Sequence, residues 1–237
     1  MQGTIFYFIN SKVNNLQILK SYESNSYFRR NIKFYDSYKN KKDKKISKLI
    51  KKKLFKARSI LEIGCANGIK LNQYKQELKS NVNYGIDLSS LAINHGKKRF
   101  KNLKLFKLSS LEIDKIKIKF DLIICGFFLY LLDRDDLLKQ FELIHQKLNL
   151  NGHLVINDFH PRKKHSLRPP HNKKLKYFKE TYDKFLEESG LFKKVYQDVF
   201  KHRTLIKKHS KSQEAISAFK KINFIKSFPQ KKIKRIK

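Results

Sequence analysis

The sequence predicts an α/β fold: a doubly wound, mostly parallel sheet with helices on both faces and an antiparallel hairpin at the C-terminal end. Three observations predict it. Short apolar segments alternate with amphipathic ones from about residue 59 to residue 159. The segment FDLIICG, residues 120–126, is continuously apolar, as is typical of a strand buried on both faces of a parallel sheet. A turn of small residues joins the first strand to the next helix, where such sheets bind ligands.

The elements follow in order, beginning with a segment of weak periodicity. Residues 1–43 mix polar and aromatic side chains, so we expect a helical or irregular N-terminal cap. Residues 44–55 carry apolar side chains at helical spacing between lysines, which predicts an amphipathic helix. That helix opens the main domain, residues 44–222. After that helix we expect strands at 59–64, 82–88 and 103–108. Helices are predicted between them, one at 69–78 and one that is capped by Ser89 and ends near Phe100.

The second half of the domain continues the alternation and then breaks it. After the strand at 120–126, we expect a helix at 133–148 and a strand within 149–159. Residues 160–174 contain prolines and basic residues and predict a long loop over the carboxyl ends of the strands. A helix is expected at 177–189, stopped by Gly190. Two late strands at 192–200 and 214–221, joined by a basic loop, predict an antiparallel pair, and residues 223–237 a frayed basic tail.

The composition limits the class of protein. The 237 residues include 40% hydrophobic ones and carry a formal net charge of +35, which alone would indicate binding to nucleic acid or an anionic membrane. Most of the 55 basic residues are lysines, whereas arginine is the better bidentate ligand of phosphate. Lysine, isoleucine, asparagine and phenylalanine share A/T-rich codons, so we interpret the charge mainly as genome composition. Non-specific nucleic-acid binding through the basic surface stays an alternative.

The sequence also bears on location and metals. The N-terminus lacks the basic and long apolar regions of a signal peptide, and no segment approaches the roughly 20 apolar residues of a membrane span. We therefore expect a cytoplasmic protein. The two cysteines, Cys65 and Cys125, match neither a disulfide framework nor a zinc spacing, so we expect reduced thiols and no metal site.

The turn after the first strand has Gly64, Ala66 and Gly68 at alternate positions. Small residues there let a ligand approach the bare backbone. The spacing lacks the third glycine of a dinucleotide fingerprint, and no Gly-Lys-Ser/Thr follows as in a P-loop. The turn therefore suits a ligand with a nucleoside but no phosphates. Asp87, at the tip of the second strand, supplies a carboxylate suited to the ribose hydroxyls.

Four segments taken together, LEIGCANG, YGIDLS, FDLIICGFFLYLLD and LNLNGHLVINDF, resemble the class I S-adenosylmethionine-dependent methyltransferases over about residues 59–161. A weaker resemblance joins SYFRRN and the C-terminal segments to methyltransferases of sugar biosynthesis and small-molecule metabolism. The resemblance implies a Rossmann-like fold with a seven-stranded sheet and S-adenosyl-L-methionine as cofactor.

The resemblance also implies roles for individual residues. Glu62 would receive the methionine amino group, and the backbone at Gly64, Cys65 and Gly68 would cradle the methionine and ribose. Asp87 would bind the ribose hydroxyls, and Leu88 would pack on the adenine. Ser109 or Ser110 stands where relatives often have an acid that contacts the adenine, so a cofactor contact is implied there. Arg30 would bind the cofactor carboxylate. Cys125 begins a segment, ending at Tyr130, that would line the methyl-transfer site.

The acceptor is the least defined part of the prediction. His160, Asp158 and Tyr130 are the candidate catalytic residues, with His165 and His171 as further candidate bases. No Asn/Asp-Pro-Pro-Tyr/Phe follows the fourth strand, which disfavours base-amine methylation of DNA, and no common RNA-binding module is present. We expect a small metabolite or sugar-linked acceptor. The alternatives are an RNA methyltransferase that uses the basic surface and a non-catalytic scaffold protein that only binds the cofactor.

Overall fold

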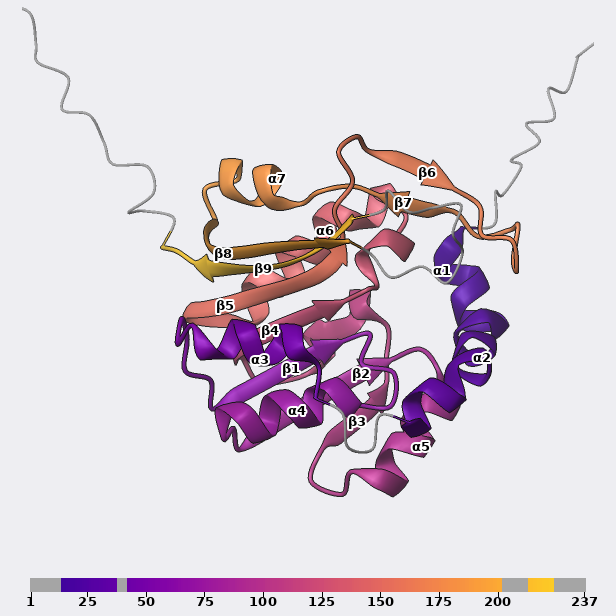
Figure 1. The fold of residues 1–237 in the computed structure, drawn as a ribbon, viewed down its shortest axis with the longest axis horizontal. Helices are drawn as coiled ribbons and strands as arrows, with labels where there is room; N and C mark the ends of the chain where they lie inside the picture. The colour runs from indigo at the N-terminus through magenta and orange to yellow at the C-terminus, as the bar shows by residue number, and fades with distance from the viewer. Residues whose placement is uncertain (1–13, 38–41, 202–212, 224–237) are drawn as a thin grey trace, which may run out of the picture.

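The computed structural model describes residues 14–37, 42–201 and 213–223, and its centre is a seven-stranded sheet (Figure 1). The strand order is β3-β2-β1-β4-β5-β9-β8. Strands β3 to β5 run parallel in this order, whereas β9 is antiparallel to both β5 and β8. The strands are β1 (Ser59–Ile63), β2 (Val82–Asp87), β3 (Lys104–Lys107), β4 (Phe120–Gly126), β5 (Leu148–Phe159), β8 (Phe192–Lys201) and β9 (Gln213–Lys221). The predicted seven-stranded, mostly parallel sheet with its antiparallel hairpin is confirmed.

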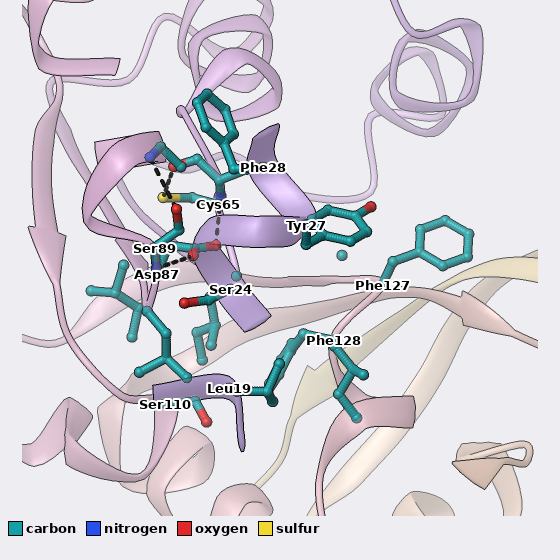
Figure 2. Close-up of a pocket in the computed structure, with 18 of the residues that line it drawn as sticks. Leu19, Ser24, Tyr27, Phe28, Cys65, Asp87, Ser89, Ser110, Phe127 and Phe128 are labelled. Carbon is teal, nitrogen blue, oxygen red and sulfur yellow. Dashed lines mark hydrogen bonds between the residues drawn. The ribbon is translucent and has the colours of Figure 1, made fainter. Parts of the chain in front are cut away.

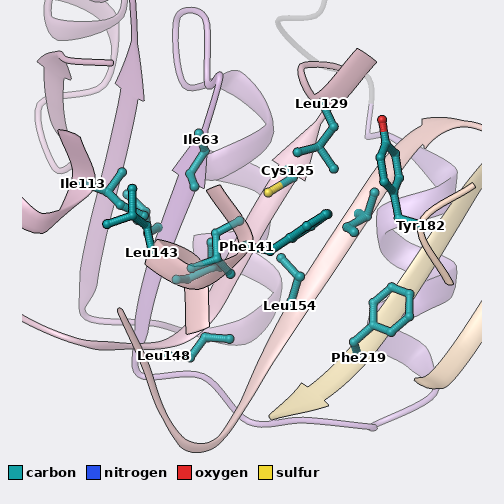
Figure 3. Close-up of a cluster of buried hydrophobic side chains, with 14 of the residues drawn as sticks. Ile63, Ile113, Cys125, Leu129, Phe141, Leu143, Leu148, Leu154, Tyr182 and Phe219 are labelled. Carbon is teal, nitrogen blue, oxygen red and sulfur yellow. The ribbon is translucent and has the colours of Figure 1, made fainter. Parts of the chain in front are cut away.

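Helices cover both faces of the sheet, as predicted. One apolar cluster joins the sheet to α3 (Lys44–Lys51), α4 (Ile69–Leu78) and α5 (Ser90–Arg99), and a second joins its other face to α6 (Arg134–Lys147) and α7 (Asp183–Glu188). Figure 3 shows the second cluster, in which Phe141 and Leu143 of α6 pack on Cys125 and Leu154 of the sheet. Among the described residues, no helix combines the length and apolar character needed to cross a membrane.

The N-terminal cap is helical over its described part. It consists of α1 (Asn15–Ile18), a π-helical segment (Leu19–Glu23) and α2 (Ser24–Ser37), which lie along one side of the sheet near α5 (Figure 1). Side-chain amides tie it to the domain. Asn15 donates to the carbonyl oxygens of Leu131 (2.8 Å) and Lys176 (2.6 Å), and Asn25 Oδ1 accepts from Ser89 Oγ (2.9 Å). The parts of the cap at 1–13 and 38–41 lie outside the described residues.

The C-terminal third departs from the prediction. The expected helix at 177–189 is wrong in its first part, because β7 (Tyr177–Lys179) pairs with β6 (His165–Leu167) in a small two-stranded sheet. Only α7 is helical there. Contacts distant in sequence explain the difference: Arg134 forms an ion pair with Glu180 and lies 4.7 Å from the centre of the Phe178 ring. Residues 160–174 thus contain a strand as well as loop. The hairpin loop at 202–212 and most of the predicted tail, 224–237, lie outside the described residues.

The close packing of α5 against the turn after β1 leads to a stability prediction. A Cβ atom at Gly96 would overlap the carbonyl oxygen of Asn67 and lie 2.6 Å from Leu105 Cδ1. Gly→Ala in a helix usually stabilises by about 1 kcal/mol, but overpacking costs roughly 1–3 kcal/mol. We expect Gly96→Ala to lower the free energy of unfolding by about 1 kcal/mol, measured by urea denaturation. Lys97→Ala, at an exposed neighbouring position, should change it by less than about 0.5 kcal/mol. An unchanged or higher stability of Gly96→Ala would contradict this packing.

Candidate functional site

A cavity of about 440 Å³ opens at the carboxyl ends of the parallel strands, where the sequence predicts a ligand. Its floor comes from residues at the ends of β1, β2, β4 and β5, and the N-terminal helices cover it. Figure 2 shows Tyr27 and Phe28 of α2 beside Cys65 and Asp87. The main lining residues are Leu19, Ser24, Tyr27, Phe28, Glu62, Gly64, Cys65, Ala66, Lys70, Asp87, Leu88, Ser110, Phe127, Phe128, Tyr130, Phe159 and Tyr177.

The turn after β1 presents bare backbone to this cavity. Gly64, Ala66 and Gly68 have φ values of +71°, +49° and +77°, which favour glycine or a small residue. The amides of Gly64 and Cys65 both donate to the carbonyl oxygen of Ile86, at 2.9 and 3.0 Å, which ties the turn to β2. A Cβ atom at Gly64 would lie 3.0 Å from Phe128 Cβ. The glycine therefore keeps space between the turn and the segment after β4.

Asp87 is held by the same turn. Its Oδ2 accepts the amide of Ala66 (2.9 Å) and its Oδ1 accepts the amide of Ser89 (2.8 Å), as the dashed lines in Figure 2 indicate. Burial raises the pKa of Asp87, and these amides act against the rise. Each carboxylate oxygen has two lone pairs, so each keeps one for a ligand. A fixed, two-oxygen acceptor of this kind suits a pair of neighbouring hydroxyls.

Glu62 is the second carboxylate in the cavity wall and is only 2% exposed. Its Oε2 atom is buried and has no hydrogen-bond partner among the residues that the structure describes. Burial raises its pKa to about 8, and the nearby Lys70 ammonium acts in the opposite direction. Burying a carboxylate without a partner is costly, which makes this atom a position for a cationic or hydrogen-bond-donating ligand group.

The other side of the cavity is aromatic. The ring of Tyr130 lies 4.8 Å from that of Tyr177 and 5.1 Å from that of Phe159, and the Phe127 ring lies 5.6 Å from Phe159. Phe127 has φ +53°, a strained conformation that recurs at functional sites. Burial raises the pKa of Tyr130 and raises that of Tyr177 to about 12, so both hydroxyls stay neutral at pH 7. This wall suits a flat or apolar ligand.

The structure brings most predicted site residues to this one cavity. Seven of them line it: Glu62, Gly64, Cys65, Asp87, Leu88, Ser110 and Tyr130. Gly68 lies just behind the turn, where it precedes α4. Ser109 is buried below Ser110, and its hydroxyl accepts the amide of Leu111 at 3.4 Å.

Besides Gly68 and Ser109, four further predicted residues do not line the cavity. Cys125 is fully buried in the apolar cluster under α6, where the Figure 3 view shows it. Arg30 forms an ion pair with the buried Glu23. Asp158 and His160 line a separate hollow of about 10 Å³. Asp158 nevertheless accepts the amide of Tyr130 at 3.4 Å, and burial raises its pKa to about 7.

Sequence reasoning missed the residues that reach the cavity from other segments. Tyr27 and Phe28 come from the cap, Tyr177 from β7, and Lys70 from the first turn of α4. Of these residues only Lys70 could be predicted from local sequence, because it follows the glycine turn by two positions. The others depend on contacts between distant segments.

Comparison with known proteins agrees with this geometry. The family described as "Methyltransferase domain" matches residues 32–224, most of the chain. This chain belongs to the class I S-adenosylmethionine-dependent methyltransferases. A curated relative, the uncharacterized protein RP028 of Rickettsia prowazekii (strain Madrid E), is 33% identical over 103 residues, and the match spans 41% of each protein. The chain thus spans about two fifths of the length of that relative.

Solved methyltransferase structures share the fold. The N-methyltransferase NodS of Bradyrhizobium japonicum WM9 is 20% identical with a TM-score of 0.57, covering 76% of this chain and 96% of that one. Magnesium protoporphyrin IX methyltransferase of Synechocystis PCC 6803, with bound S-adenosylmethionine, is 13% identical with a TM-score of 0.63, covering 90% and 99%. The 1,6-didemethyltoxoflavin-N1-methyltransferase of Burkholderia thailandensis is 15% identical with a TM-score of 0.62, covering 84% and 87%.

S-adenosylmethionine is the cofactor of this methyltransferase family, and the residues present fit it. The unpartnered Oε2 of Glu62 matches its ammonium group, and the free lone pairs of Asp87 match its ribose hydroxyls. The glycine turn leaves room between them. A volume of about 440 Å³ lies within the roughly 300–1,000 Å³ usual for small-molecule sites.

Proposed function

We propose that this methyltransferase transfers a methyl group from S-adenosylmethionine to a small-molecule acceptor held against Tyr130, Phe127 and Tyr177. One observation carries the proposal: the cofactor pocket continues into an aromatic wall, and helices of the cap cover both parts. A covered cavity of this size suits a metabolite. Two of the similar structures, 1,6-didemethyltoxoflavin-N1-methyltransferase and magnesium protoporphyrin IX methyltransferase, are named for small-molecule acceptors, which supports the same class.

The chemistry asked of this chain is mainly alignment. When bound, the cofactor supplies a methyl group on a positively charged sulfur. Tyr130 and Tyr177 present neutral hydroxyls and ring faces with which to orient an acceptor. Apolar walls exclude water, and holding two reactants in line accounts for much of the rate of such transfers. We assign Asp158 a positioning role, because it accepts the backbone amide of Tyr130. His160 takes no part in the proposal.

The RNA alternative relies on the lysines of residues 41–56 and of the basic tail as a phosphate surface. Two of them already have carboxylate partners, Lys45 with Glu214 and Lys48 with Asp198. Each pairing reduces the charge available to a nucleic acid. These ion pairs between α3 and the hairpin therefore favour the small-molecule acceptor.

The test begins with calorimetric titration of S-adenosylhomocysteine into the protein in about 0.3 M salt, where non-specific attraction to the polycation is screened. We expect micromolar binding. Labelled methyl transfer would then be compared between a low-molecular-mass metabolite fraction and total RNA. Product that stays in the metabolite fraction and survives ribonuclease supports the proposal. Ribonuclease-sensitive product would replace it with RNA methylation, and binding without any transfer would favour the scaffold alternative.

A further inference from the structure

The cavity wall has one notable basic residue. Among the described residues that line the cavity, Lys70 is the only lysine, arginine or histidine. It stands in the first turn of α4, directly after the glycine turn. Its ammonium group lies 5.8 Å from the centre of the Phe127 ring and 4.0 Å from Asp43 Oδ2, and its side chain is 28% exposed. A distance of 4.0 Å is long for an ion pair, so Asp43 leaves much of this ammonium available to a ligand.

Lys70 and Glu62 place opposite charges in the wall of the same cavity. Glu62, at the end of β1, and Lys70 line the same cavity from the two sides of the glycine turn. Burial raises the pKa of Glu62 to about 8, and Lys70 is the main charge opposing that rise, which places the two groups within electrostatic reach. The methionine part of the cofactor is a zwitterion with an ammonium and a carboxylate on one carbon atom. A carboxylate and an ammonium on the protein match it in both charges.

We propose that Lys70 binds the carboxylate of the methionine moiety while Glu62 accepts its ammonium group. This inference rests on the proposed function, because it concerns the same cofactor. It differs from the expectation that Arg30 would hold the carboxylate. Arg30 forms an ion pair with Glu23, which also accepts from Asn172 Nδ2 at 2.8 Å, and Arg30 is not among the lining residues.

Lys70 would then act as a specificity residue for the amino-acid half of the cofactor. A charge-assisted contact at a partly exposed position is weaker than a buried one but clearly measurable. We expect Lys70→Gln to weaken binding of S-adenosylhomocysteine about tenfold. Binding of 5′-methylthioadenosine, which has the same nucleoside and thioether without the amino acid, should stay within about twofold of wild type. The ratio of the two affinities therefore isolates the contacts with the amino-acid part of the ligand.

The experiment titrates both ligands into four proteins in about 0.3 M salt: wild type, Lys70→Gln, Lys75→Gln and Arg30→Gln. Lys75→Gln is the matched control, because it removes the same charge from the same helix at a position outside the cavity lining. Thermal unfolding checks that each variant is folded. We expect the affinity for S-adenosylhomocysteine, divided by the affinity for 5′-methylthioadenosine, to fall only in Lys70→Gln. Arg30→Gln, which loosens the cap, should affect both ligands alike.

The outcomes separate this inference from the proposed function. A ratio lowered at least about fivefold in Lys70→Gln alone supports the Lys70 contact. An unchanged ratio in Lys70→Gln, or one that falls in Arg30→Gln instead, overturns it while leaving cofactor binding intact. Wild-type protein that is folded yet binds neither ligand overturns the proposed function itself, and with it the assignment of Lys70.

Discussion

Replacing Asp87 with alanine is expected to lower the affinity for S-adenosylhomocysteine at least about 100-fold. The carboxylate has one lone pair free on each oxygen after binding the amides of Ala66 and Ser89. Two hydrogen bonds from ribose hydroxyls to an ionised group are worth roughly 1.5–3 kcal/mol each, which is more than a factor of 100 together. Calorimetric titration of both proteins measures the difference directly.

The control must separate ligand contact from loss of structure, since Asp87 also fixes the glycine turn. Asp121 offers a match at the opposite end of the sheet. Its Oδ2 accepts the amides of Arg58 (2.9 Å) and Ser59 (3.0 Å), and it lines no part of the cavity. We expect Asp121→Ala to lower the melting temperature while the affinity stays within about threefold of wild type. Equal losses of affinity in Asp87→Ala and Asp121→Ala would mean that Asp87 acts through folding alone.

The central half of the fold follows from local sequence. Strands β1 and β4 are short apolar runs next to a turn, and a parallel sheet with crossover helices is the arrangement that buries such runs on both faces. The small residues at 64, 66 and 68 predict the turn because positive φ restricts the residue type, and all three do have positive φ. Asp87 is also predictable from local sequence, because it ends the strand next to β1 and so lies beside the glycine turn.

The rest of the site depends on contacts that local sequence does not encode. Asn15 bonds to residues 116 and 161 positions away, and Asn25 to residues about 65 positions away. Those contacts hold the cap over the cavity, so Tyr27 and Phe28 become lining residues without a motif that marks them. The sequence predicts a helix from Tyr177 to Ser189, with Gly190 as its stop. Pairing with β6, which depends on residues ten or more positions away, makes the first part of that segment a strand instead.

Replacing Glu62 with glutamine is expected to change stability and cofactor binding in opposite directions. Burial raises the pKa of Glu62 to about 8 from its ordinary value of 4.5. Between these pH values the folded protein holds a proton that the unfolded chain has released, so the contribution of Glu62 to stability falls as pH rises, by at most about 1.4 kcal/mol per pH unit. Glutamine carries no charge and avoids this loss. Unfolding of the ligand-free proteins at pH 5 and pH 8 should show Glu62→Gln gaining on wild type at the higher pH.

A second buried carboxyl group, Asp158, also affects how stability depends on pH and serves as a control. Burial raises its pKa to about 7, so it lowers stability with pH in the same direction. Because it is present in both proteins, its effect cancels in the comparison. Asp158→Asn should reduce the pH dependence of stability without removing the binding of S-adenosylhomocysteine, since Asp158 lines the separate small hollow. If stability of wild type and Glu62→Gln changed in parallel from pH 5 to pH 8, Glu62 would have an ordinary pKa in the folded protein.

Cofactor binding should favour wild type over Glu62→Gln, because a cationic ligand group binds best to the ionised carboxylate of Glu62. At pH 7 a large part of the ligand-free wild type carries a protonated Glu62, so binding of S-adenosylhomocysteine should release a proton, and affinity should rise with pH below 8 by at most about tenfold per unit. Titrations in two buffers of different ionisation enthalpy count that proton. Glu62→Gln should bind at least about tenfold more weakly and release none. Proton release that persists in Glu62→Gln would mean that another group releases the proton. Loss of both the proton release and the affinity identifies Glu62 as the acceptor of the ligand ammonium group, a role that explains why an oxygen of this buried carboxyl group has no hydrogen-bond partner among the described residues.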